Sequence, residues 1–497
     1  MKWSVWTLCT LEMMGMLAAP SGVASERVPV APDGPYARVY HPRQAPSTAD
    51  QQGFPHSWPM IYGNAKHNAA FDLTGPAWLL KGVRWRYMEA RAWPLSRAPF
   101  GLRVDGERLA LTTITQFYGN SLGVAAVDGV VYAESDDQFA YAVNARTGRL
   151  IWRTSPVGNT LMGNPLVSGN MVYVSAGSVG FNFSNVVRYA KHGKAIRGGG
   201  ISFSGIYALN RQNGRLLWHF ATRGEAMPTP ALAGRQLFLS TGSGNITALD
   251  AVNGNLLWRT HVGGIANMSA LAVAGGRIYV SMSVKPYLYC LDARTGHVIW
   301  RAQIPRAANT GMGDVAPAVS HNVVVMDAVT VPRGRAAKAS MDTVVRGYDA
   351  RTGHVLWTQR MGRGPKPPAF KGGMPMIHND VVYVGTPVNS VYKAFRLRDG
   401  RELWSWHVPD AGPAGAGRGA ATYYRGTLYV STGPTLYALD PVTGRVIGHD
   451  HVGGRFGIVN PVIVGGTIYL ANSWDWLMAV PVGDVNPAFH KQLATTP

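Results

Sequence analysis

One stretch of sequence decides the fold: Tyr289–Trp300, which reads YCLDARTGHVIW. Its pattern is an apolar run, an Asp, a Thr-Gly turn and a closing Trp. More or less regular copies occur at 141–152, 207–218, 247–258, 346–357, 395–404 and 437–448, the last with Gly448 in place of the Trp. The turn glycines of successive copies are roughly forty to sixty residues apart, and a repeat of this length is typical of a β-propeller.

A second hairpin lies between successive copies of this repeat. Examples are Pro230–Ser240 (PALAGRQLFLS) and Ala272–Ser281 (AVAGGRIYVS), in which apolar residues flank a Gly-rich turn. The period of two predicts paired strands. Each unit therefore holds four strands, A to D; the Asp of the C–D turn accepts turn N–H groups, and the Gly takes a positive φ. We expect the Trp on strand D to fill the gap between neighbouring blades, which is a structural role and not a catalytic one.

The number of A–B hairpins predicts an all-β, eight-bladed propeller of four-stranded antiparallel blades. The eighth hairpin is followed by a third strand, Trp474–Val480, but by no obvious fourth one. Near the N-terminus, Lys81–Tyr87 (KGVRWRY) has the Gly and the Trp of a strand D. We expect it to pair with the last blade, because this would close the ring and remove the free sheet edge. An extra hairpin at Leu102–Thr113 lies outside this count.

The N-terminal residues predict export. Residues 1–25 read as a secretory signal, because Lys2 precedes the mostly apolar run Trp3–Ala19 and small residues follow it. No later run has the roughly 20 apolar residues that a membrane helix needs. We expect a signal peptide at 1–25, an N-terminal extension at 26–54, one propeller domain at 55–482 with insertions near 178–204 and 329–343, and a tail at 483–497.

The formal net charge is +20, from 47 Lys and Arg against 27 Asp and Glu. Such a charge first suggests nucleic acid. The basic residues are dispersed, however, and the signal directs the chain away from the cytoplasm, so we expect no nucleic-acid partner. Scarce carboxylates fit an acidic exterior better, because ion pairs made by carboxylates are lost below about pH 4. Two cysteines, one of them Cys9 in the signal, exclude a four-thiolate zinc site, an iron–sulfur cluster and an internal disulfide.

The repeat resembles the propeller of the pyrroloquinoline-quinone (PQQ) enzymes, and Trp58–Ala70 (WPMIYGNAKHNAA) is similar to their entry segment. Three groups of this superfamily compete. The quinoprotein alcohol dehydrogenases carry adjacent cysteines over the quinone, which this chain lacks, and no clear calcium-ligand set is visible. The propeller lipoprotein of outer-membrane assembly is shorter and has a lipobox, which is also missing here. Length, signal, basic charge, cysteine poverty and insertions resemble the tetrathionate hydrolases of acidophilic sulfur-oxidising bacteria.

The resemblance to the tetrathionate hydrolases implies an exported enzyme, often a homodimer, that acts in strong acid in the periplasm or at the outer cell surface. Such an enzyme would cleave tetrathionate with water to thiosulfate, sulfate and sulfur, and it would need no cofactor and no metal. A PQQ-dependent dehydrogenase and a non-catalytic envelope scaffold are the alternatives. Tetrathionate turnover, dye-linked oxidation of alcohols with PQQ, and capture of outer-membrane partners distinguish the three.

Asp327 is the leading candidate for a catalytic acid. It follows His321–Met326 (HNVVVM), where sister blades carry Ser, Gly or Ala. We expect a carboxyl at the end of an inner strand, facing a low-dielectric funnel, to have a raised pKa and to act as a general acid on a sulfur–sulfur bond. The alternative is a structural Asp that caps its own loop; the match to the catalytic acid region of the tetrathionate hydrolases favours function. The runners-up are Asp314, Glu134 and Asp136, the last two from the same position of an earlier blade.

The loops that join strand D to the next strand A gather on one face, around the propeller axis. Several of them carry an arginine, and converging guanidinium groups would bind a dianion with two sulfonate ends bidentately. Any single loop arginine has the alternative role of keeping the surface solvated. The candidates for substrate binding are Arg223, Arg306, Arg363, Arg418 and Arg455.

Overall fold

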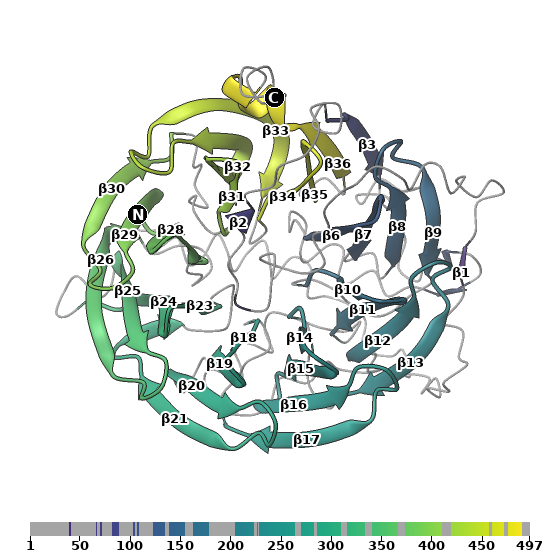
Figure 1. Ribbon diagram of the computed structural model, residues 1–497, viewed down its shortest axis with the longest axis horizontal. Coiled ribbons are helices and arrows are strands. Elements are labelled where there is room, and N and C mark those ends of the chain that lie inside the picture. Colours follow the sequence, from purple (N-terminus) through teal and green to yellow (C-terminus); the bar gives the residue numbers. More distant parts are fainter. Residues whose placement is uncertain are drawn as a thin grey trace, which may run out of the picture.

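The computed structural model describes residues 39–40, 66, 70–71, 82–88, 103–104, 107–108, 123–134, 139–154, 163–177, 204–222, 226, 228–263, 270–282, 286–309, 316–332, 340–365, 373–409, 419–456, 460–471 and 476–489. Within them the chain forms eight antiparallel blades that are arranged as a ring (Figure 1). The predicted all-β, eight-bladed propeller is therefore confirmed. The signal peptide predicted at 1–25 lies outside the described residues, as does nearly all of the insertion at 178–204.

The first four blades follow one another along the chain, each with its first strand nearest the centre of the ring (Figure 1). Blade 1 consists of β6 (Val124–Val127), β7 (Val130–Glu134), β8 (Ala140–Asn144) and β9 (Leu150–Thr154), with β1 (Val39–Tyr40) at its outer edge. Blade 2 consists of β10 (Leu166–Ser168), β11 (Met171–Ala176), β12 (Gly205–Asn210) and β13 (Leu216–Ala221). Blade 3 consists of β14 (Ala231–Ala233), β15 (Gln236–Ser240), β16 (Asn245–Asp250) and β17 (Leu256–His261). Blade 4 consists of β18 (Ala272–Ala274), β19 (Arg277–Ser281), β20 (Tyr287–Asp292) and β21 (Val298–Gln303).

Blade 5 has long outer strands, as blade 7 also does. It consists of β23 (Ala318–Ser320), β24 (Val323–Thr330), β25 (Ser340–Asp349) and β26 (Val355–Pro365), and β22 (Ala307–Asn309) pairs with the far end of β24. Blade 6 consists of β27 (Met376–His378), β28 (Val381–Thr386), β29 (Val391–Arg396) and β30 (Glu402–His407). Blade 7 consists of β31 (Thr422–Tyr424), β32 (Thr427–Leu439) and β33 (Val446–Phe456), with β2 (Ala70–Phe71) parallel to β31. The first half of β32 pairs with β31 and its second half pairs with β33, so this one segment fills the second and third strand positions.

An N-terminal strand closes the ring. Blade 8 consists of β34 (Val462–Val464), β35 (Thr467–Ala471), β36 (Trp476–Pro481) and β3 (Trp85–Met88). In the antiparallel pair of β3 and β36, Trp85 lies opposite Ala479 and Tyr87 lies opposite Leu477. The predicted closure is confirmed: β3 covers the edge of β36 and takes the outer, fourth position of the blade. The hairpin outside the count, β4 (Arg103–Val104) with β5 (Glu107–Arg108), forms a separate two-stranded sheet.

The tryptophans of the repeat join neighbouring blades. An added Cβ at Gly400 would lie 2.6 Å from the Trp357 ring of the preceding blade, and φ at Gly400 is +72°, a conformation that L side chains avoid. Six described tryptophans donate the indole N–H to a carbonyl of the next blade, and the bond from Trp357 to Leu397 measures 2.7 Å. Both parts of the repeat, the bulky ring and the bare glycine, are needed for this contact.

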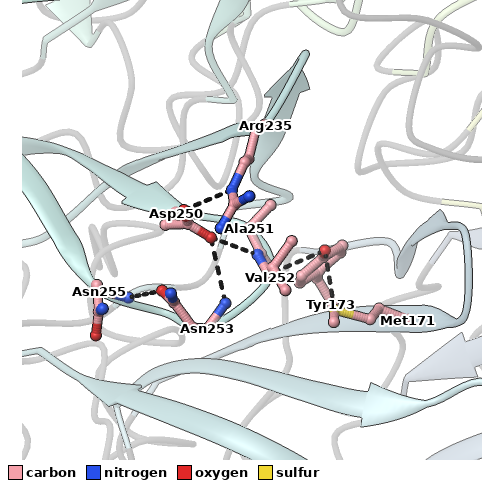
Figure 2. A network of polar contacts seen from close by, with 8 residues as sticks. All are labelled: Met171, Tyr173, Arg235, Asp250, Ala251, Val252, Asn253 and Asn255. Atoms are coloured by element: carbon pink, nitrogen blue, oxygen red, sulfur yellow. Dashed lines mark hydrogen bonds and ion pairs between the residues drawn. The ribbon is translucent and has the colours of Figure 1, made fainter.

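The Asp of the repeat shapes the C–D turn, as the sequence predicts. Figure 2 shows this turn in blade 3, where Oδ1 of Asp250 accepts hydrogen bonds from the N–H groups of Val252 at 2.8 Å and Asn253 at 3.3 Å. The other oxygen of Asp250 accepts from Arg235 at 2.7 Å. The Tyr173 hydroxyl of blade 2 donates to the Ala251 carbonyl at 2.9 Å, so the turn also contacts the preceding blade. The Asp residues of the repeat are therefore structural.

The C-terminal segment packs where the repeat lacks its tryptophan. A Cβ at Gly448 would lie 2.5 Å from Pro487 and from the Val485 carbonyl. The short helix α4 (Val482–Val485) precedes this contact, and Phe489 is buried in one core cluster with Tyr424. Residues beyond the expected domain limit of 482 therefore complete the junction of blades 7 and 8. Among the described residues, no helix is long and apolar enough to cross a membrane.

Candidate functional site

The fifth residue of each second strand forms a ring of equivalent positions. The A–B register fixes this equivalence, since the first residue of each second strand pairs with the last residue of the first. Carboxyl side chains occur in this ring at Glu134 of blade 1 and Asp327 of blade 5, on opposite sides of the propeller (Figure 1 shows β7 and β24). The other positions hold Ser175, Ser240, Ser281, Gly385, Ser431 and Ala471.

Asp327 is buried in the wall of the propeller, with 0% exposure. Its Oδ2 accepts a hydrogen bond of 2.8 Å from the N–H of Gly373, which precedes the first strand of blade 6. Burial raises the pKa of the Tyr392 hydroxyl in blade 6, and the nearby charge of Asp327 raises it further. That hydroxyl stays protonated and donates to the Gly419 carbonyl at 2.5 Å. The sequence suggested a strand end at Asp327, whereas β24 continues to Thr330 because β25 is also longer.

Glu134 is equally buried but differently surrounded. Its exposure is 0%, and neither carboxyl oxygen has a hydrogen bond of acceptable geometry within the part of the chain that the structure describes. Burial raises the pKa of Glu134 well above its ordinary value of 4.5, and the nearby backbone N–H of Ser175 opposes this effect without cancelling it. Burial thus favours the protonated form of Glu134. Asp327 alone of the two has a backbone donor that orients it.

Two of the arginines predicted from the sequence meet around one carboxylate, Asp342. Arg363 holds both carboxylate oxygens, with Nε at 2.7 Å and Nη2 at 3.0 Å. The hydrogen bond from Arg363 lowers the pKa of Asp342 most strongly; burial opposes it, and the charges of Arg363, Arg360 and Arg306 lower it further. Arg306 also donates to the Val331 carbonyl. We refer to Arg306, Arg360 and Arg363 as the arginine cluster.

The strand register places the arginine cluster on the same ladder as Asp327. Asp342 lies opposite Thr330 on one side and opposite Arg363 on the other. Thr330 is in turn three residues beyond Asp327 on β24, a distance of about 10 Å in an extended strand. Side chains alternate between the two faces of a sheet, so Asp327 and Thr330, three residues apart, lie on opposite faces. Asp327 faces blade 6, where Gly373 donates to it, and Asp342 lies on the face that Thr330 shares. The extension of blade 5 therefore brings the acid and the cations to one blade but not to one face.

The remaining candidates are not brought to this blade by described residues. Arg455 lies in β33, and its side chain is outside the described part. Cys290 is buried in β20, and burial raises the pKa of its thiol to about 12, so it is not a nucleophile. The described residues contain no group of three or more His, Cys, Asp or Glu side chains that could hold a metal ion. The candidates outside the described residues are Arg223, Arg418, Asp314 and Asp136.

The sequence did not indicate Asp342 or Arg360 as candidate site residues. Both lie in blade 5 beyond the length of the ordinary repeat, where no sister blade offers an equivalent position. The signal for them in the sequence is that Arg360 and Arg363 follow Trp357 closely. In the structure, the polar Asp342-Thr343 pair of the neighbouring strand lies opposite the end of this segment.

Curated relatives identify the family. A tetrathionate hydrolase of Acidithiobacillus ferrooxidans is 55% identical to this chain over 470 residues, which are 94% of each protein. A tetrathionate hydrolase of Acidianus ambivalens is 37% identical over 480 residues, 91% of this chain and 88% of the relative. This chain belongs to the tetrathionate hydrolase family.

Tetrathionate hydrolases of this kind share their repeat with a wider group of propellers. The family model described as outer membrane protein assembly factor BamB matches residues 92–265, 202–343, 265–411 and 388–484, so the repeats belong to that family as well. A europium-containing methanol dehydrogenase matches with a TM-score of 0.54 and 12% identity, over 85% of this chain and 91% of the other. The quinohemoprotein alcohol dehydrogenase of Comamonas testosteroni matches with a TM-score of 0.52 and 13% identity, over 87% and 83%. These solved structures show the fold alone.

Proposed function

We propose that this chain hydrolyses tetrathionate and that blade 5 carries the reaction. The observation that carries the proposal is a buried carboxyl, Asp327, on one strand ladder with the arginine cluster, in a member of the tetrathionate hydrolase family. The overall reaction converts tetrathionate and one water into thiosulfate, sulfate, one sulfur atom and two protons. Atoms and charge balance, and no external oxidant or reductant takes part.

We assign the proton transfers to Asp327. The carboxyl is fully buried, so we propose that the reacting sulfur–sulfur bond is brought to it away from bulk water. The protonated carboxyl gives its proton to the departing sulfur, and the carboxylate formed then takes a proton from the attacking water. The hydrogen bond from Gly373 at 2.8 Å holds one carboxyl oxygen, Oδ2, in place. Each cycle restores the acid.

We assign the binding of a sulfonate end to the arginine cluster. A guanidinium group presents two parallel N–H donors that match two oxygens of a sulfonate. The Arg363 side chain is 51% exposed, although Asp342 occupies its Nε and one Nη in this structure. Arg306 supplies a second guanidinium from the segment before β22, anchored by its bond to the Val331 carbonyl. Tetrathionate carries a sulfonate at each end, so this cluster can hold one end of the anion.

Asp327→Asn tests this assignment. The amide oxygen of Asn can still accept the Gly373 N–H, so we expect the fold and the thermal stability to be retained. Loss of the proton donor should lower tetrathionate turnover by about 10²–10⁴-fold, measured as thiosulfate formed by purified protein in acid. Turnover within a few-fold of wild type would remove Asp327 from the mechanism.

Asp349→Asn is the matched control in the same blade. Asp349 caps the C–D turn through the N–H groups of Arg351 and Thr352, both at 2.9 Å. Blades 1 and 2 carry Asn144 and Asn210 at the equivalent position and form the same turn bonds. The control variant should therefore fold and turn over tetrathionate as wild type does.

We also infer that the protein is exported, acts in acid and forms a homodimer. The apolar run after Lys2 supports export, and the scarcity of carboxylates supports work in acid. Cell fractionation of an expressing acidophilic bacterium should find the mature chain, shortened by about 25 residues, in the periplasm or at the outer surface. Light scattering of the purified protein should give twice the mass of one chain. A cytoplasmic full-length chain, or a monomer at all concentrations, would contradict the respective inference.

A further inference from the structure

We propose that Asp342 is an internal stand-in for the substrate: its carboxylate fills the guanidinium fork of Arg363 until acid neutralises it, and a sulfonate end of tetrathionate then takes its place. The inference rests on the proposed function, because it concerns how that site admits its substrate. Asp342 would thus determine the pH at which the arginine cluster becomes free to bind.

The Asp342–Arg363 pair has the geometry of an oxoanion held in a fork. Arg363 approaches one carboxylate oxygen with Nε at 2.7 Å and the other with Nη2 at 3.0 Å. A sulfonate offers two oxygens to a guanidinium in the same way. The side chain of Asp342 is 12% exposed and that of Arg363 is 51% exposed. About half of the Arg363 side chain is therefore open to solvent, and we propose that a sulfonate approaches the fork from that side.

The charges around Asp342 favour an anion at this point. Two elements bring the cations, since Arg360 and Arg363 lie on β26 and Arg306 precedes β22. The third neighbour, β24, contributes the Thr330 hydroxyl, which donates to the backbone carbonyl of Asp342 at 3.2 Å and not to its carboxylate. Within the described residues, Asp342 thus feels the charge of three guanidinium groups, of which Arg363 bonds its carboxylate directly. When Asp342 loses its charge, the cluster keeps a positive field that a dianion can neutralise.

Carboxylates and sulfonates differ in how they respond to acid. An Asp carboxylate takes up a proton near pH 4, whereas a sulfonate stays ionised in much stronger acid. Acidification therefore removes the internal competitor and leaves the substrate charged. Because the hydrogen bond from Arg363 lowers the pKa of Asp342, this release needs stronger acid than an isolated Asp would. Above that pKa, substrate binding has to be accompanied by the uptake of one proton.

Calorimetric titration of the Asp327→Asn variant with tetrathionate tests the proposal, because this variant should bind without turning the substrate over. We expect the Kd to rise by up to about tenfold for each pH unit above the pKa of Asp342. Titrations in two buffers of different ionisation enthalpy should show about one proton taken up per tetrathionate in that range. Binding with a constant Kd and without proton uptake would overturn the proposal.

Adding Asp342→Asn to this variant should remove both effects, leaving a Kd that is low and nearly independent of pH. Adding Asp349→Asn instead should leave them unchanged. If the Asp342→Asn double variant does not fold, Arg363→Lys in the Asp327→Asn background gives the second test, since loss of the bidentate fork should weaken binding at least about tenfold in acid. An unchanged Kd would overturn the proposal.

The outcomes separate this inference from the proposed function. A wild-type protein without tetrathionate turnover would refute the function itself. A wild-type protein that turns tetrathionate over, with a pH-dependent Kd that is the same with and without Asp342, would refute only the role of Asp342.

Discussion

The indole N–H groups of Trp218 and Trp258 form a matched pair for measuring what one hydrogen bond contributes to blade docking. Both rings lie against a turn glycine, where an added Cβ at Gly254 or Gly296 would come within 2.5 and 2.4 Å of the respective ring. Both are half-buried and have an aromatic neighbour, with ring centroids 5.9 and 6.0 Å apart. Only Trp258 donates, to the Ala293 carbonyl at 3.0 Å. Nε1 of Trp218 is buried and has no acceptor in the part of the chain that the structure describes.

The expected difference follows from this asymmetry. Substitution by Phe removes the same atoms at both positions, so the loss of apolar contact nearly cancels between the two variants. Trp258→Phe also loses a hydrogen bond that contributes about 0.5–1.5 kcal/mol, whereas Trp218→Phe removes a buried, unpaired N–H that costs about 1–3 kcal/mol. We therefore expect Trp258→Phe to lower the free energy of unfolding by about 2–4 kcal/mol more than Trp218→Phe does.

Guanidinium chloride denaturation followed by circular dichroism measures the difference, provided that the slope of free energy against denaturant stays unchanged. Trp300→Phe serves as a second reference, because Trp300 donates to the Ala350 carbonyl at 3.1 Å and should behave like Trp258. Equal losses for Trp218→Phe and Trp258→Phe would refute the reasoning, since ring packing alone would then account for docking.

Two further variants concern the buried acid of blade 1 and the C-terminal segment. Burial raises the pKa of Glu134, so folding favours its protonated form; this stability is complete in acid and is lost as the pH rises above about 4.5. Glu134→Gln should thus raise Tm near neutral pH and leave it nearly unchanged in acid, and parallel curves of Tm against pH would contradict this. Removal of residues 482–497 should lower stability by about 3–5 kcal/mol, because it uncovers Tyr424 and breaks the bonds of Asn486 to Thr427 at 3.2 Å and Tyr429 at 3.1 Å. Calorimetry checks this, and an unchanged Tm would show that the segment only rests on the propeller.

The fold could be predicted because the same local sequence features recur in the copies of the repeat. The Asp, Gly and Trp of the repeat each have one physical task, in the turn, at positive φ and between blades, so several copies gave the same answer independently. The same logic assigned Trp85 to a closing strand far from its partner Ala479 in sequence. The repeat could not predict what fills the gap beside Gly448, because the segment that does so, around Pro487, belongs to no repeat.

The site could be predicted only where it departs from the repeat. Asp327 and Glu134 were found because their sister positions hold small or hydroxyl side chains. The sequence ranked Asp327 before Glu134, but it could not show what orients Asp327, since the Gly373 N–H comes from a loop without a repeat pattern. Asp342 was missed for a related reason, because β25 and β26 extend past the ordinary blade and only their register brings Asp342 opposite Arg363.

Eight similar blades do not indicate where one reaction takes place, so the reaction site is expected where a blade differs from the others. Blade 1 differs once: it has a buried acid, Glu134, without an oriented donor, and no arginine cluster among its described residues. Blade 5 differs twice on one ladder, with the oriented Asp327 and with an extension that carries three guanidinium groups around Asp342. An anionic substrate whose cleavage needs a proton requires both a proton donor and cations. Among the described residues, blade 5 holds both an oriented buried acid and a guanidinium fork, and we therefore propose that Asp327 and Asp342 are the residues to test first.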